Sequence, residues 1–293
     1  MRLRVLGTVC ICLMLATGYP ALGADRLALV IGNADYSSDM LPELKNPTND
    51  AALIASSLEA TGFDVNTVMN ADLRAMKRAI QEFAGKLANA DPDAIAAFYY
   101  SGHGFQANGL NYLAPLGAEL RDEVDAEFEA LSVDWVLGKL EQAHEGANLV
   151  MLDACRNTAL SRSIGPASEG LALLRATPRG SFISFATAPG STATDGKGLN
   201  SPYTAAIASE IRTPGLTVEA AFKNVRRAVV AASRGEQVPW DHSSLTSDIV
   251  FVPLDNARSG SGGASNVGGD AIALELQLWN DVKDTGSAQQ IEA

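Results

Sequence analysis

Runs of apolar residues alternate along this chain with segments whose apolar residues recur at helical spacing. Residues 26–32 read Arg-Leu-Ala-Leu-Val-Ile-Gly, which is typical of a strand buried on both faces of a parallel sheet. The segment 72–90 instead predicts an amphipathic helix, because its large apolar residues follow one another every three or four positions. These residues are Leu73, Met76, Ile80, Phe83 and Leu87.

The same pattern continues to residue 252 and predicts the fold class. Strands that alternate with helices form βαβ units, so we expect an α/β fold with a mostly parallel sheet and helices on both faces. Loops at the carboxyl ends of such strands usually form the site. Three long loops are candidates for functional segments: 105–131, with a short hairpin around residues 111–113, 157–180 and 189–201. We expect strands over 26–32, 63–69, 94–100, 147–152, 181–187 and 248–252, and helices over 46–60, 72–90, 133–143, 202–211 and 217–232.

The two ends of the chain differ in composition from its middle. Residues 1–24 have an early basic stretch, an apolar run and small residues at the end, which predicts a signal peptide and export to the periplasm or the medium. Residues 25–254 are then the main domain. A Gly/Ser-rich linker follows over 255–270, and residues 271–293 have the spacing of one amphipathic helix. We expect no membrane contact once the leader is removed.

Charge and cysteine content narrow the function further. The formal net charge is −12, which argues against nucleic acid or anionic lipid as a partner and suits substrates with basic residues. Of the three cysteines, Cys10 and Cys12 lie in the leader, so the mature chain has no internal disulfide. The three histidines have no spacing typical of a zinc site, and no metal is predicted. The oligomeric state is not indicated by the sequence.

The remaining thiol, Cys155, follows one predicted strand, and His103 follows another 52 positions upstream. An imidazole that takes the thiol proton makes the sulfur a strong nucleophile. The backbone N–H groups of Gly104 and Cys155 can stabilise an oxyanion in the same cleft. Asp153 lies two residues before Cys155, so both side chains share one face of the strand. Asp50 lies in the first turn of a predicted helix, where an acid is favoured in any case.

The motifs Tyr-Tyr-Ser-Gly-His-Gly at 99–104 and Asp-Ala-Cys-Arg at 153–156 resemble those of the caspase-like cysteine peptidases, in particular the bacterial metacaspase-like group, or orthocaspases. Segments 29–33, 49–51 and 237–240 resemble that group as well. One departure is Asn-Thr-Ala at 157–159, where relatives often have Asp-Asn-Pro.

The resemblance implies a caspase-like three-layer α/β/α sandwich with a mostly parallel six-stranded sheet. It also implies peptide hydrolysis after Arg or Lys through a Cys155 thioester, with His103 as acid and base. The pocket for the basic side chain would consist of Asp50, Ser101 and Asp153.

Further expectations concern processing and cofactors. The segment 157–180 carries three candidate sites of self-cleavage, Arg162, Arg175 and Arg179. No cofactor is expected to be required. Calcium activates some metacaspases, and residues 119–129 are acidic, but they contain no calcium motif. Two alternatives stay open: a catalytically weak caspase-fold module that binds or regulates a partner, and another thiol chemistry such as transpeptidase or thioesterase action.

Overall fold

The computed structural model describes residues 24–154, 170–174 and 176–254. Its centre is a six-stranded sheet in the order β2-β1-β3-β7-β8-β9. The first five strands of this order are parallel, and the last one, β9, pairs antiparallel with β8. The predicted α/β class and the mostly parallel six-stranded sheet are therefore confirmed. The strands are β1 (Arg26–Gly32), β2 (Asp64–Met69), β3 (Ile95–Ser101), β7 (Ala147–Asp153), β8 (Ser181–Phe185) and β9 (Trp240–Ser243).

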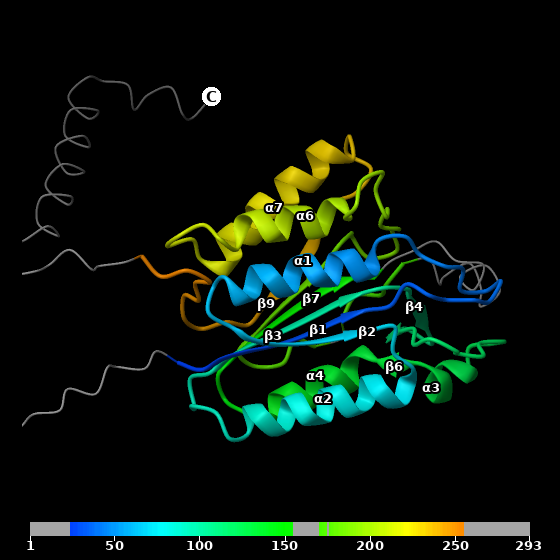
Figure 1. The fold of residues 1–293 in the computed structure, drawn as a ribbon, viewed down its shortest axis with the longest axis horizontal. Coiled ribbons are helices and arrows are strands. Elements are labelled where there is room, and N and C mark those ends of the chain that lie inside the picture. Colours follow the sequence, from blue (N-terminus) through cyan, green and yellow to red (C-terminus); the bar gives the residue numbers. More distant parts are fainter. Residues whose placement is uncertain (1–23, 155–169, 175, 255–293) are drawn as a thin grey trace, which may run out of the picture. The chain divides into compact units, whose positions relative to one another are not determined.

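Helices cover both faces of this sheet, which makes three layers (Figure 1). Helices α1 (Pro47–Glu59), α6 (Pro202–Glu210) and α7 (Val218–Ala232) lie on one face. Helices α2 (Leu73–Leu87) and α4 (Val133–Ala143) lie on the other. The central strands are buried along their whole length because both of their faces are covered.

Side-chain hydrogen bonds at the N-caps fix where four of the helices start, close to the positions that the sequence predicts. The Asp72 carboxylate accepts from the Ala75 amide at 2.7 Å and so caps α2. Ser132, Ser201 and Thr217 cap α4, α6 and α7 in the same way. The ends of ten of the eleven predicted elements lie within three residues of the observed ones.

The prediction of a last strand over 248–252 is wrong. This segment makes only an isolated bridge between Val250 and Thr217, and β9 occupies the sheet edge instead. The carbonyl groups of the segment find other donors. Val218 N donates to Ile249 O at 2.8 Å, and the Arg26 guanidinium donates to the carbonyls of Val250 and Phe251. With these groups satisfied, Phe251 is buried and the apolar residues beside it are partly buried without joining the sheet.

The long loop after β3 contains the predicted hairpin as part of a small antiparallel sheet. Its strands are β4 (Gly104–Ala107), β5 (Leu110–Leu113) and β6 (Leu131–Ser132). A short helix, α3 (Asp125–Glu129), precedes β6. This small sheet begins directly after His103, so it ties the end of β3 to the surrounding loops.

The predicted leader, apart from Ala24, lies outside the described residues, as do the linker over 255–270 and the helix over 271–293. The sheets and helices above all belong to one compact unit that ends at Pro253. Among the described helices, none combines the length and the apolar character needed to cross a membrane.

Candidate active site

His103 lies at the carboxyl end of a central strand, between β3 and β4, and is buried. Its backbone is held on both sides. The His103 amide donates to the Tyr36 hydroxyl at 3.2 Å, and its carbonyl accepts from the Ala114 amide and the Tyr100 hydroxyl, each at 2.9 Å. Three separate segments therefore fix the position of this residue.

The His103 imidazole is oriented by the loop that follows β1. Its Nε2 lies 2.7 Å from the carbonyl oxygen of Pro42, and its ring centroid lies 4.6 Å from that of Tyr36. A carbonyl only accepts, so the proton of the neutral ring resides on Nε2 and Nδ1 becomes the basic nitrogen. The sequence does not predict the contacts of Tyr36 and Pro42 with His103. Pro42 lies 61 residues before His103, and no short motif marks contacts between such distant segments.

The turn that carries His103 packs on the strand that leads to Cys155. Ser101 of β3 and Asp153 of β7 are direct partners in the parallel register, and Gly102 N donates to Asp153 O at 3.3 Å. A Cβ atom on Gly104 would lie 2.7 Å from the carbonyl oxygen of Ala154, so the contact tolerates only glycine. Ala154 is the last described residue before Cys155. Cys155 itself, like Arg162 and Arg175, lies outside the described residues.

The three predicted pocket residues come together at this end of the sheet. Asp50, Ser101 and Asp153 are all fully buried. Ser101 donates its hydroxyl to Asp50 Oδ2 at 3.2 Å, and Asp50 Oδ1 accepts from the Ser201 amide at 2.9 Å and the Asn200 side chain at 3.1 Å. Asp50 comes from the first turn of α1, Ser101 from β3 and Asp153 from β7. Sequence positions 50, 101 and 153 thus share one site.

Two further residues join this site from the start of α6. The hydroxyls of Ser201 and Thr204 both donate to Asp153 Oδ2, the latter at 2.9 Å. The Tyr99 hydroxyl lies 2.5 Å from Thr204 Oγ1. Burial, and next the charges of Asp153 and Asp50, raise the pKa of Tyr99 well above its ordinary value, so this phenol keeps its proton. The only sequence signal for this group was the helix start at Ser201-Pro202.

The loop over 189–201 is attached to its surroundings by polar contacts. Asp195 Oδ2 accepts from the Lys45 amide at 3.1 Å, and Asp195 O accepts from the Asn46 side chain at 2.5 Å. Gln237, from the segment 237–240 that resembles the family, accepts from the Thr194 amide at 3.1 Å and donates to Ala186 O at 2.9 Å. The buried glutamine therefore links this loop to the end of β8.

Arg179, the third predicted self-cleavage residue, is described and exposed. Its amide donates to Glu141 Oε1 at 3.2 Å, and the next residues begin β8. It lies at the amino end of the sheet, away from His103. The histidines outside the site have structural contacts: His144 forms a 2.9 Å hydrogen bond with Asn148, and the His242 ring meets Phe185 and Trp240.

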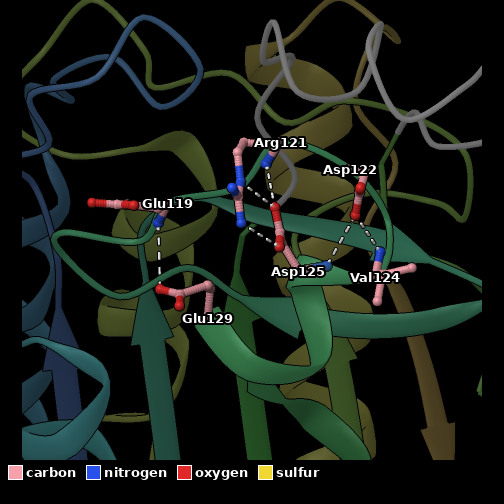
Figure 2. Close-up of polar contacts among 6 residues, drawn as sticks. All are labelled: Glu119, Arg121, Asp122, Val124, Asp125 and Glu129. Atoms are coloured by element: carbon pink, nitrogen blue, oxygen red, sulfur yellow. Dashed lines mark hydrogen bonds and ion pairs between the residues drawn. The ribbon is translucent and has the colours of Figure 1, made fainter.

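The acidic segment 119–129 uses its carboxylates locally (Figure 2). Asp125 accepts from the Arg121 amide and guanidinium, and these hydrogen bonds lower the pKa of Asp125. Asp122 Oδ1 accepts from the amides of Val124 and Asp125, and Glu129 accepts from the amide of Glu119. In the part of the chain that the structure describes, no group of three or more His, Cys, Asp or Glu side chains could hold a metal ion.

The buried imidazole of His103 and the buried carboxylate of Asp153 thus lie at the ends of two adjacent parallel strands, β3 and β7. Cys155, the only cysteine of the main domain, follows Asp153 by two residues. A histidine and a cysteine that follow neighbouring strands of such a sheet are typical of α/β cysteine peptidases. Comparison with known proteins specifies the family: residues 25–250 match the family model described as the caspase domain, and the chain belongs to this family of caspase-like cysteine peptidases.

Individual relatives agree with this assignment. The chain is 30% identical over 137 residues to the human mucosa-associated lymphoid tissue lymphoma translocation protein 1, and 31% identical over 142 residues to its mouse homologue. These matches cover 46% and 48% of this chain but only 15% and 16% of the relatives. The crystal structure of caspase-1 from Spodoptera frugiperda superposes with a TM-score of 0.57 at 18% identity, over 80% of this chain and 92% of that one. The caspase fold expected from the motifs is therefore confirmed.

Proposed function

We propose that this protein is a cysteine endopeptidase that hydrolyses peptide bonds after Arg or Lys, with Cys155 as nucleophile and His103 as acid and base. The observation that carries the proposal is the alignment of two strand ends. Ser101 and Asp153 are register partners, and Gly104 packs against Ala154. The fold therefore places the turn that carries His103 in contact with Ala154, the residue before Cys155.

The chemistry follows from the orientation of the imidazole. With the Nε2 hydrogen on the Pro42 carbonyl, His103 Nδ1 takes the thiol proton of Cys155. The thiolate attacks the scissile carbonyl, and the oxyanion is stabilised by the N–H groups of Gly104 and Cys155. Collapse forms a thioester and breaks the C–N bond, while His103 returns the proton to the leaving amine. Water then attacks the thioester with His103 again as base, which releases the acid and restores the thiol.

The preference for a basic residue is supported by the two buried carboxylates. Asp50 and Asp153 are both 0% exposed, and charges removed from water interact more strongly with a cation. A carboxylate accepts about four hydrogen bonds, so it can serve the donors described above and a guanidinium together. Ser101, which donates to Asp50, completes the proposed pocket.

The setting of the reaction rests on the sequence. The leader motif supports export to the periplasm or the medium, and the motifs favour the bacterial metacaspase-like branch. Proteins or peptides with basic residues would be the substrates. Self-cleavage after Arg162, Arg175 or Arg179 is part of the proposal. Fragments that end at one of these residues, seen by mass spectrometry in wild type and not in Cys155→Ala, are the expected result. An active wild-type chain that stays intact would refute self-cleavage.

Hydrolysis of fluorogenic peptides that end in Arg, Lys or Asp tests the function, with and without calcium. We expect cleavage after Arg and Lys that is lost in Cys155→Ala and in His103→Ala. The matched control is Ser132→Ala, which removes a helix cap on the opposite face of the sheet and should stay active. Cleavage after Asp would retain the peptidase and overturn the pocket. No cleavage at all would favour the catalytically weak binding module.

A further inference from the structure

The N-terminal end of α6 lies beside both buried carboxylates of the proposed pocket, those of Asp50 and Asp153. The hydroxyls of the N-cap residue Ser201 and of Thr204 in the first turn both donate to Asp153. The Ser201 backbone N–H donates to Asp50 Oδ1 at 2.9 Å, while the Ser201 hydroxyl donates to Asp153 Oδ2. A single residue thus bridges an acid from α1 and an acid from β7. All three residues are fully buried.

The direction of each hydrogen bond can be assigned. Ser201 Oγ accepts from the Thr204 amide at 3.0 Å as the helix cap, so its own hydrogen is available for Asp153. Thr204 Oγ1 donates to the same carboxylate oxygen at 2.9 Å. Since its only hydrogen is used there, the 2.5 Å contact with Tyr99 must be a bond donated by the phenol. A chain of donors from Tyr99 through Thr204 therefore ends on Asp153.

We infer that Ser201 and Thr204 are positioning residues for the specificity of this enzyme, because they orient the Asp153 carboxylate and hold it together with Asp50 for a basic substrate side chain. This inference rests on the proposed function and deepens it. A carboxylate that accepts two hydroxyl hydrogen bonds has less rotational freedom, so it is already oriented when the substrate binds. This preorganisation strengthens the binding of a guanidinium, while the cysteine and histidine that react with the peptide bond stay unchanged.

The test compares two peptides that differ only in Arg or citrulline at the cleaved position. Citrulline has nearly the shape of arginine and no charge, so the ratio of the two kcat/KM values measures recognition of the cation. Thr204→Val removes one hydroxyl at nearly constant volume. We expect a roughly tenfold or larger fall in the Arg-to-citrulline ratio, expressed mainly as a rise in KM for Arg, because a hydrogen bond to a charged group contributes about that factor.

Two control variants and one further test variant separate positioning from folding. Thr204→Ser keeps the hydroxyl and should retain the ratio of the wild type. Ser132→Ala removes a cap of the same kind from α4, where its acceptor role is limited to the Trp135 amide, and should leave the ratio unchanged. Ser201→Ala should lower the ratio in the same direction as Thr204→Val. Unfolding midpoints of all variants are measured in parallel, so that the ratio is read only from folded protein.

The outcomes distinguish this inference from the proposed function. Wild-type cleavage after Arg, lost in Cys155→Ala, combined with an unchanged ratio in folded Thr204→Val and Ser201→Ala, would overturn the inference alone. A ratio that falls equally in Thr204→Ser would also overturn it, because the hydroxyl would then not be the cause. Absence of Arg cleavage by the wild type would overturn the proposed function and this inference with it.

Discussion

Replacing Gly104 with alanine should damage the site through one steric contact. The added Cβ would lie 2.7 Å from the Ala154 carbonyl oxygen and 2.8 Å from the Ala154 Cβ. Ordinary contacts begin near 3.4 Å, so the turn after His103 and the end of β7 must separate by roughly 0.7 Å. The backbone of Gly104 does not have a positive φ, and the effect is therefore one of space alone.

The size of the effect follows from this displacement. Forcing an extra carbon into a packed contact costs about 1–3 kcal/mol of unfolding free energy. A misplacement of about 1 Å between reacting groups reduces turnover by about 100-fold. Because Ala154 directly precedes Cys155 and Gly104 directly follows His103, the strain acts between the two proposed catalytic residues. We expect kcat/KM to fall by about 100-fold while most of the protein stays folded.

Urea unfolding and hydrolysis of an Arg peptide measure the two quantities. Gly138→Ala is the matched control, since a Cβ there meets nothing within 4 Å and the residue lies inside α4. Alanine in this half-buried helical position, where the added Cβ has free space, should stabilise the protein by about 0.5–1 kcal/mol and leave hydrolysis unchanged. Wild-type stability and activity in Gly104→Ala, or equal losses in both variants, would refute the steric argument.

The remaining predictions concern stability. The pKa of Tyr99 is raised by burial and by Asp153 and Asp50; an unfolded tyrosine ionises near pH 10, so the stability due to Tyr99 is complete below pH 10 and is lost as the pH rises toward the folded-state pKa. Above pH 10, the unfolding free energy of Tyr99→Phe should therefore fall with pH less steeply than that of the wild type, by up to about 1.4 kcal/mol per pH unit. Urea unfolding at several pH values measures this, and equal pH dependence of the two proteins would contradict it. Arg26→Lys should cost about 1–2 kcal/mol, because one ammonium cannot reach the carbonyls of Val250 and Phe251 as the guanidinium does. The exposed Arg78→Lys should change the unfolding free energy by less than about 0.5 kcal/mol, and equal effects of the two changes would refute the role of Arg26.

The sequence by itself determined the elements and their alternation. Buried strands such as β1 and amphipathic helices such as α2 are local patterns, and capping residues such as Asp72 mark helix starts within a few residues. The motifs around His103 also indicated the family, because catalytic chemistry needs particular residue types in particular contexts. Local information does not say which apolar run pairs with which neighbour. For that reason the apolar pattern predicts a strand over 248–252, whereas the structure places the polar strand Trp240–Ser243 at the edge of the sheet.

Only the tertiary structure decided which distant groups meet at the site. The Pro42 carbonyl that orients His103, the Tyr36 ring beside it and the hydroxyls of Ser201 and Thr204 on Asp153 have no short-range signature. They reach the site because parallel strands end at one edge of the sheet and the loops of that edge converge. A backbone carbonyl or a helix cap looks the same in every sequence, and its role depends on what the fold brings within hydrogen-bonding distance.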